Sequence, residues 1–178
     1  MRQRDLDSLG ALFLIPLLVG CAASHPAAPS PMPAQLRAAP PQVLALELRA
    51  TGVQVYECRP SQGDPARFDW LLKAPEAELS DHAGKPVGRH FAGPTWEATD
   101  GSKVVGEVVA RDSGPDPAAI PWLLLRATTA SGSGVFAQTQ SIQRLHTVGG
   151  KAPAEGCSQS QNGTQLRVPY SADYLFYR

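Results

Sequence analysis

Short runs of β-type residues recur along most of the chain, and turn-forming residues separate them. In the run Gly52–Cys58 the two valines point to one side of an extended chain, and the glutamine, tyrosine and cysteine point to the other, because side chains alternate along a strand. The same reasoning predicts strands over Val43–Leu48, Gly52–Cys58, Phe68–Lys73, Arg89–Phe91, Thr95–Thr99, Ser102–Ala110, Trp122–Ala130, Val135–Val148, Leu166–Val168 and Asp173–Arg178.

Turn and helix signals between these runs predict the fold class. Asp100-Gly101 suits a type I′ hairpin turn, whose central residues both need a positive φ, and Ser131–Gly134 predicts a second hairpin. Only Pro75–Asp81 predicts helix, of one or two turns, with Pro75 at the first helical position. We therefore predict a single-domain, all-β fold, an antiparallel sandwich or small barrel with long loops and at most one short helix. A mixed α+β fold is the alternative.

The first 20 residues have the parts of a bacterial export signal. Two arginines give a positive start, and Leu9–Val19 is an apolar run of 11 residues, too short for a membrane-spanning helix of about 20. The run ends in Leu18-Val19-Gly20-Cys21, which is typical of a lipobox. We expect cleavage before Cys21 and lipidation of this cysteine. An ordinary signal peptide, cut at another position, is the alternative.

The remaining residues divide into a spacer and one domain. Residues 21–42 contain six prolines among alanines, a composition that favours an extended tether. Residues 43–178 are long enough for one domain with a hydrophobic core. Lipid on Cys21 would anchor this domain to a membrane of the bacterial cell envelope. The residue after Cys21 is alanine and not an acid, which favours an anchor in the outer membrane, with the domain facing the periplasm.

Charge and cysteine content limit the function further. Without residues 1–20 the chain keeps 14 basic and 14 acidic side chains, and no run of one sign. Nucleic-acid binding needs a basic face, so we expect no nucleic-acid partner. Cys58 and Cys157 form an even pair in an oxidising compartment, which predicts a disulfide. A thiol nucleophile or a metal ligand is the alternative.

Catalytic and cofactor motifs are missing from the sequence. Gly132–Ala137 fits the glycine spacing of a dinucleotide-binding loop, but β-type residues follow where a helix is required, so we interpret it as a hairpin turn. The sequence has no Gly-x-Ser-x-Gly elbow, phosphate loop or His-Glu-x-x-His motif. We therefore expect no cofactor and assign no catalytic residue.

The segment Gly88–Trp96 is the main candidate for a binding site, because it mixes glycine, proline, aromatic and polar residues as functional loops on β scaffolds do. The candidate ligand-binding residues are His90, Trp96, Arg89 and Asp100. The alternative for His90 is a structural histidine that bonds the backbone in a tight turn.

Histidines and aromatic residues permit further hypotheses. His90 with Asp100 or His146 would supply acid–base or metal chemistry to an envelope enzyme. His82, His90, His146 and Asp100 could bind a metal only if the fold brought them close together, so we assign no metal site. Six aromatic side chains could form a stacking surface for sugars or aromatic ligands: Trp70, Trp96, Trp122, Tyr56, Tyr170 and Tyr174. Burial of these side chains in the core is the alternative.

Several segments taken in order also carry a family resemblance. They are Gly52–Cys58, Trp70–Pro75, Val87–Trp96, Asp100–Val104, Ile120–Leu124, Ile142–Arg144, Thr147–Gly150 with Ala152-Pro153, Cys157 and Val168–Tyr174. Their order and spacing resemble domain-of-unknown-function family 3455, over residues 43–178. The resemblance implies an exported protein of a bacterial and fungal family with a pair formed by Cys58 and Cys157, and it transfers no catalytic residue.

These observations together predict an exported, lipid-anchored protein of the cell envelope that binds a ligand or a protein partner. The anchor, the tether, the neutral charge and the lack of a catalytic motif support this expectation. An envelope enzyme and a structural role in the envelope are the alternatives.

Overall fold

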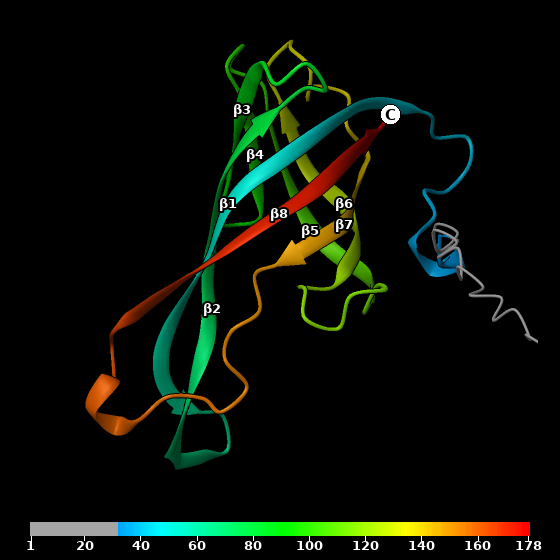
Figure 1. The fold of residues 1–178 in the computed structure, drawn as a ribbon. Coiled ribbons are helices and arrows are strands. Elements are labelled where there is room, and N and C mark those ends of the chain that lie inside the picture. Colours follow the sequence, from blue (N-terminus) through cyan, green and yellow to red (C-terminus); the bar gives the residue numbers. More distant parts are fainter. Residues whose placement is uncertain (1–31) are drawn as a thin grey trace, which may run out of the picture.

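Eight antiparallel strands form a closed barrel in the computed structural model, which describes residues 32–178 (Figure 1). Each strand pairs with its neighbours in sequence, and β8 closes the ring against β1. The predicted signal peptide and Cys21 lie outside the described residues. The strands are β1 (Leu44–Ser61), β2 (Asp64–Ser80), β3 (Pro86–Phe91), β4 (Thr95–Ala98), β5 (Lys103–Asp112), β6 (Trp122–Ser131), β7 (Ser141–Gly149) and β8 (Gln165–Tyr177), with two 3-10 helices, η1 (Ala34–Leu36) and η2 (Gln159–Gln161).

The all-β prediction is confirmed, and the fold is the barrel rather than the sandwich. Its core consists of side chains that alternate with partly exposed ones along each strand. In β8 these are Tyr170, Ala172, Tyr174 and Phe176. Phe136, from the loop before β7, fills one end of the barrel against Phe176, with ring centroids 4.6 Å apart. Burial of each such large apolar side chain contributes about 1.5–3 kcal/mol.

Strand β1 joins two runs that the sequence predicts as separate strands, Val43–Leu48 and Gly52–Cys58. Gly52 lies inside this strand because β2 approaches the β1 backbone there so closely that only glycine fits. A Cβ atom at this position would lie 2.5 Å from the Ala77 Cα atom. The two predicted runs at the C-terminus merge in the same way into β8.

The helical prediction for Pro75–Asp81 is wrong, because these residues belong to β2, apart from Asp81, which follows it. Ala77 and Leu79 are buried and the two glutamates beside them are less so, which is the period of a strand. Pro75 is tolerated because β3 pairs with β2 only from Ala77 onward, so this part of β2 has β1 as its single strand neighbour.

The hairpin at Asp100-Gly101 forms, but the type I′ prediction is wrong. Only Gly101 has a positive φ, of 83°. The Gly101 amide donates to Ala98 O, and the Ala98 amide donates to Ser102 O, so the loop has three residues and ends in a glycine bulge. The Asp100 carboxylate accepts from the Ser102 amide at 2.8 Å and stabilises this turn.

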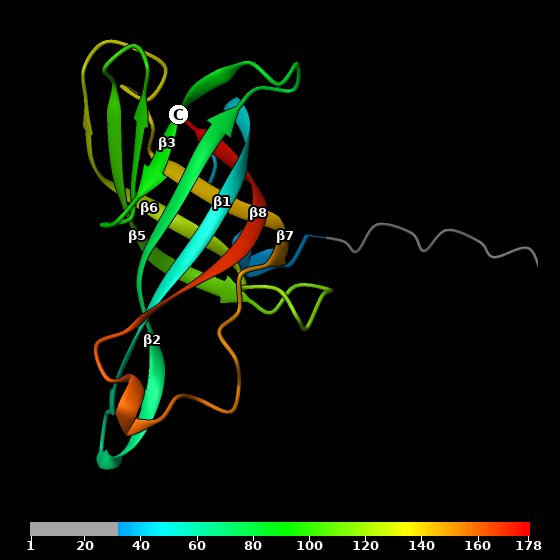
Figure 2. The ribbon, with the colours of Figure 1, turned by 60° about the vertical axis from the view of Figure 1, so that its left-hand side comes forward.

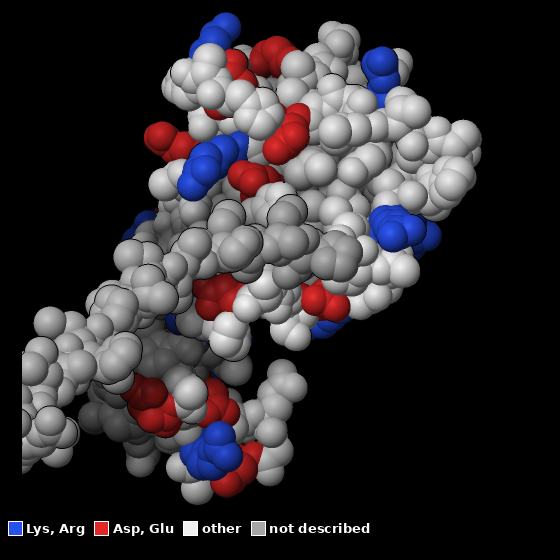
Figure 3. Space-filling view, turned by 45° about the vertical axis from the view of Figure 1, so that its right-hand side comes forward, with Lys and Arg blue, Asp and Glu red and all other residues white. Residues whose placement is uncertain are grey.

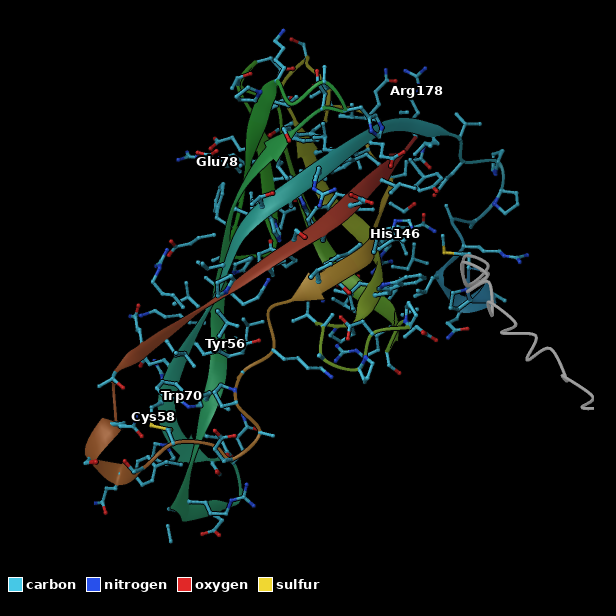
Figure 4. All side chains as sticks on the ribbon, in the orientation of Figure 1. Tyr56, Cys58, Trp70, Glu78, His146 and Arg178 are labelled. Carbon is cyan, nitrogen blue, oxygen red and sulfur yellow. A yellow bond between two sulfur atoms is a disulfide. The ribbon has the colours of Figure 1, made fainter. Side chains whose placement is uncertain are left out.

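The far halves of β1 and β2 project from the barrel as a long twisted hairpin (Figures 1 and 2). A disulfide between Cys58 and Cys157 joins this hairpin to the loop that carries η2, and Phe68 forms a β-bridge with Cys157. Figure 4 shows Cys58 and Trp70 on the projecting part, with Tyr56 nearer the barrel. The predicted disulfide is confirmed, and it adds a covalent link to the backbone hydrogen bonds between the hairpin and this loop.

Residues 32–42, predicted as the end of the tether, pack on the outside of the barrel. Leu36 of η1 is fully buried and lies in one apolar cluster with Trp122 and Leu145. The Gln143 side-chain amide donates to Leu36 O. This part of the chain therefore belongs to the folded domain, and the tether prediction retains only residues 21–31, which lie outside the described residues.

Basic and acidic side chains are interspersed on the face of the molecule in Figure 3. Ion pairs join strands of the described barrel: Arg126 of β6 pairs with Glu107 of the neighbouring β5, and Arg167 of β8 pairs with Glu76 of β2 across β1. Such exposed pairs contribute about 0–1 kcal/mol each. The described surface on this face carries no large patch of one sign.

Candidate functional site

The segment Gly88–Trp96 is a tight hairpin, with only residues 92–94 outside β3 and β4. His90 lies directly opposite Trp96 in the register of the two strands. Gly93 has a φ of 125°, which favours glycine, and the Thr95 hydroxyl donates to Ala92 O at 2.9 Å. The hairpin therefore holds His90 and Trp96 side by side, and both side chains are buried inside the barrel.

An aromatic cluster fixes the orientation of these two side chains. The His90 and Trp96 rings are stacked, with centroids 4.4 Å apart and planes at 12°. Tyr174 packs against them at centroid distances of 5.0 and 5.3 Å. Gly106 leaves room for the indole, since a Cβ atom there would lie 3.3 Å from the Trp96 ring. Stacked and edge-on rings of this kind form a rigid wall.

Burial keeps the His90 imidazole neutral. The pKa of His90 is lowered to about 3, chiefly by desolvation, against the hydrogen bond to Thr95 and with a smaller contribution from the charge of Arg144. Nδ1 lies 2.9 Å from Thr95 O. A carbonyl oxygen only accepts, so the neutral ring carries its proton on Nδ1 and presents Nε2 as an acceptor.

A cavity of about 380 Å³ lies inside the barrel next to this cluster. Its volume is near the lower end of the range for small-molecule sites. Its apolar wall includes Leu72, Pro75, Val108, Ile120, Leu123 and Leu125, and its polar wall includes Gln54, Tyr56, His90, Trp96, Arg144 and Tyr174.

The cavity reaches the surface where the barrel wall is incomplete. Strands β3 and β4 contain 6 and 4 residues, whereas β2 and β5 contain 17 and 10. Strand β4 pairs with β5 only over residues 103–105, so beyond the β3–β4 turn no strand separates β2 from β5. Leu72 and Val108 line the cavity from these two strands and are 57% and 39% exposed. We call this opening, between residues 72–75, residues 92–94 and the side chains of Val108 and Arg111, the window.

Four buried polar atoms have no hydrogen-bond partner among the described residues: Gln54 Nε2, Trp96 Nε1, Tyr170 Oη and Tyr174 Oη. Three of them belong to residues that line the cavity. A buried polar group without a partner costs about 1–3 kcal/mol, and native proteins rarely keep one without a reason. Unpaired polar groups therefore lie in the buried side chains that surround the cavity.

The charged residues of the cavity wall are all basic: Lys73, Arg111 and Arg144. Lys73 forms an ion pair with Glu57 at 3.0 Å. Arg144 donates from Nε and Nη2 to Pro121 O, at 3.1 and 2.9 Å, and forms no ion pair with a described residue. Its charge partly offsets the burial that raises the pKa of Tyr174. The cavity therefore has a positive potential and neutral phenols.

Comparison with known proteins assigns the chain to a family. The profile of a family described as "Protein of unknown function (DUF3455)" matches residues 39–178. The chain belongs to this family. No curated protein matches the sequence. The match begins shortly before β1 and ends with the chain, so the DUF3455 domain coincides with the barrel.

The four candidate ligand-binding residues of this DUF3455 protein occupy two kinds of position. His90 and Trp96 line the cavity. Arg89 points outward, with a side chain 70% exposed, and pairs with Glu97 at 2.5 Å. It borders an open outer hollow, where Glu76 and Arg167 form a second ion pair. Arg89 thus lies on the other side of the wall from His90.

Asp100 has a structural role in the DUF3455 fold, because its hydrogen bonds hold turns. Its carboxylate accepts from the Ser102 hydroxyl at 2.6 Å and from the Val135 amide at 2.9 Å, and these bonds lower the pKa of Asp100. It lies in the β4–β5 turn, at the opposite end of β4 from the β3–β4 turn. The structure therefore does not bring Asp100 to His90.

The other two histidines of the described residues face outward. His146 bonds Asp173 at 2.9 Å and packs edge-on against Trp122, with its side chain 63% exposed. His82 lies 3.6 Å from Glu47 and is 79% exposed. Because His90 points inward, the fold does not pair it with His146. Among residues 32–178 no group of three or more His, Cys, Asp or Glu side chains is arranged to hold a metal ion.

The aromatic residues do not form one stacking surface. Trp96, Tyr170 and Tyr174 belong to the barrel core, and Trp122 is buried beneath the N-terminal segment. Trp70 lies on the projecting hairpin (Figure 4). Tyr56 lines the cavity, and its hydroxyl donates to Gly150 O at 2.6 Å.

Sequence reasoning missed Gln54 and Arg144 as site residues, and it named Tyr174 only as a candidate for a stacking surface. The alternation in Gly52–Cys58 placed Gln54 and Tyr56 on one face, and a buried glutamine among such residues was a usable signal. Arg144 and Tyr174 had no local signal, because only the pairing of β7 with β8 sets them opposite each other.

Within residues 32–178 no helix is long and apolar enough to span a membrane.

Proposed function

We propose that this DUF3455 protein is an exported, lipid-anchored protein of the bacterial cell envelope whose barrel binds a small ligand in its interior. The observation that carries the binding function is the cavity with unpartnered buried donors behind an open window. A cavity kept only for packing would be apolar and closed. The wall is also rigid, since stacked rings and paired strands hold it.

The export and the anchor are supported by the sequence at residues 1–21. The short apolar run and the cysteine after Leu-Val-Gly match a lipoprotein signal. Acyl chains on Cys21 would hold the domain near a membrane surface, with residues 22–31 as the spacer. A binding protein in this position would capture its ligand within the envelope, close to membrane transport or modification machinery.

The anchor is tested by expressing the full chain in a double-membrane bacterial host with a clickable fatty acid. The chain should take up the label and lose the mass of its signal, and Cys21→Ser should do neither. Cys58→Ser provides the matched control and should remain labelled. Unlabelled wild-type protein, or label that survives Cys21→Ser, would exclude this anchor.

Ligand binding is tested on the full chain in nanodiscs made from one synthetic phospholipid. Small molecules extracted from the washed protein are identified and counted by mass spectrometry, with empty nanodiscs as the blank. Val108→Trp places a large ring in the window, whereas the neighbouring Val109→Trp provides a matched control, because Val109 is 53% exposed and does not line the cavity.

We expect wild-type protein and Val109→Trp to retain the same molecule in near-stoichiometric amount, and Val108→Trp to retain much less. Equal retention by all three proteins would show that binding occurs elsewhere. Absence of any bound molecule from the wild type would show that water alone fills the cavity.

A further inference from the structure

The donors of the cavity wall specify the head group of the ligand. Trp96 Nε1 and Gln54 Nε2 can only donate, and both belong to fully buried residues without a partner in the described chain. The hydroxyl of Tyr174 is also unpartnered. A ligand that satisfies these atoms must present several oxygen acceptors to one part of the wall.

The charge of the cavity wall also indicates a ligand with acceptor oxygens, and one that is negatively charged. Arg144 is part-buried, its guanidinium donates to Pro121 O and lies near Tyr174, and it forms no ion pair within residues 32–178. No Asp or Glu is among the residues that line the cavity. A buried or part-buried cation is normally paired, so the missing counter-charge is expected from the ligand. Arg111, which also forms no ion pair with a described residue, adds positive potential at the window.

The apolar wall limits the rest of the ligand. Ile120, Leu123 and Leu125 line the cavity on the side of β6 and the loop before it, and Leu72 and Val108 continue this surface to the window. These side chains offer no hydrogen bonds and favour a hydrocarbon or aromatic body. A sugar, whose hydroxyls need partners on all sides, would leave many of them unpaired here.

We propose that the ligand is a small organic carboxylate with an apolar or aromatic body, an inference that rests on the proposed ligand-binding function. The carboxylate accepts from Arg144, while the body packs on the apolar wall. A planar carboxylate matches the planar guanidinium. Of the three cations that line the cavity, Lys73 and Arg111 are exposed to solvent and Arg144 is part-buried, so one ligand charge balances the part-buried cation, which favours a carboxylate over a phosphate dianion.

The test compares acids with amides of the same shape. The full chain in nanodiscs is titrated calorimetrically with straight-chain acids from butyrate to dodecanoate and with phenylacetate and phenylbutyrate, and then with the primary amide of each. Empty nanodiscs give the blank for partition into lipid. We expect acids of the fitting length to bind at least about tenfold more tightly than their amides.

Variants of Arg144 then locate the head group. Arg144→Gln keeps a donor for Pro121 O but removes the charge, and it should lower acid affinity about tenfold or more while leaving amide affinity unchanged. Arg144→Lys keeps the charge and should retain most of the preference for acids. Arg126→Gln is the matched control, because Arg126 is 68% exposed on the outside and pairs with Glu107.

The outcomes separate this inference from the proposed function. Amides that bind as tightly as acids, or acids that bind equally to Arg144→Gln, would overturn the carboxylate while a bound molecule excluded by Val108→Trp still supports the binding function. Loss of acid affinity in Arg126→Gln as well would indicate a nonspecific charge effect and would also overturn it. If no acid binds to the wild-type protein, the carboxylate inference is overturned as well.

Discussion

Replacing His90 with phenylalanine should make the stability of the protein less dependent on pH between pH 7 and pH 5. In the folded protein the buried ring has a pKa of about 3 and stays neutral across this range. In the unfolded chain the same ring has its ordinary pKa of 6.5 and takes up a proton as the pH falls. Acid therefore stabilises the unfolded state at this residue.

The magnitude follows from the linkage between proton binding and folding. Because the folded pKa is lowered, the contribution of His90 is fully present above pH 6.5 and declines as the pH falls toward 3. Each pH unit below 6.5 removes about 1.4 kcal/mol, so the step from pH 7 to pH 5 should remove about 2 kcal/mol. This figure does not depend on the folded pKa as long as it lies well below 5.

The assay is urea unfolding of the full chain at the two pH values, with the disulfide intact, followed by circular dichroism. Phenylalanine can still stack on Trp96, and its loss of the bond to Thr95 O lowers stability at both pH values alike. His82→Phe is the control, because His82 is 79% exposed, and it should keep the wild-type response. Equal losses in wild type and His90→Phe would refute the reasoning, since His90 would then be protonated in the folded state.

Two further predictions concern other parts of the fold. Cys58→Ser combined with Cys157→Ser opens a loop of 99 residues and should lower the free energy of unfolding by up to ~4–5 kcal/mol, measured by urea unfolding against untreated wild type; an unchanged midpoint would mean that the bridge adds nothing to stability. Leu36→Ala removes a fully buried side chain from the cluster with Trp122 and Leu145 and should lower stability by about 2–5 kcal/mol in the same assay. A loss below about 0.5 kcal/mol would show that residues 32–42 are a free spacer after all.

Local patterns predicted most strands, because a strand requires only that side chains alternate along a short stretch, but the strand predicted over Val135–Val148 begins only at Ser141. The runs that became β4, β5 and β6 were placed within a few residues of their observed bounds. The helical prediction at Pro75–Asp81 failed for a tertiary reason. Acidic residues and a leading proline favour a helical turn in isolation, but pairing with residues 49–54 of β1 outweighs that weak preference.

The candidate site was found in part for the same reason. The composition of Gly88–Trp96 indicated an unusual segment, and two of its residues do border the cavity. The identity of the other cavity residues depends on which strands meet across the barrel. Alternation defines two faces of a strand and leaves open which of them turns inward, so Arg89 was grouped with His90 although the two point to opposite sides of β3.

The sequence by itself determined the β-class, the cysteine pair, the family resemblance and the expectation of export, because each depends on residues close together or on residue type alone. The tertiary structure decided that the sheet closes, that Leu36 packs on its outside, and that short strands leave a window beside His90 and Trp96. It also set Arg144 opposite Tyr174, 30 residues further along the chain. Closure and register arise from pairings between distant segments, whose free energy depends on all strands fitting at once, and no local pattern contains that information.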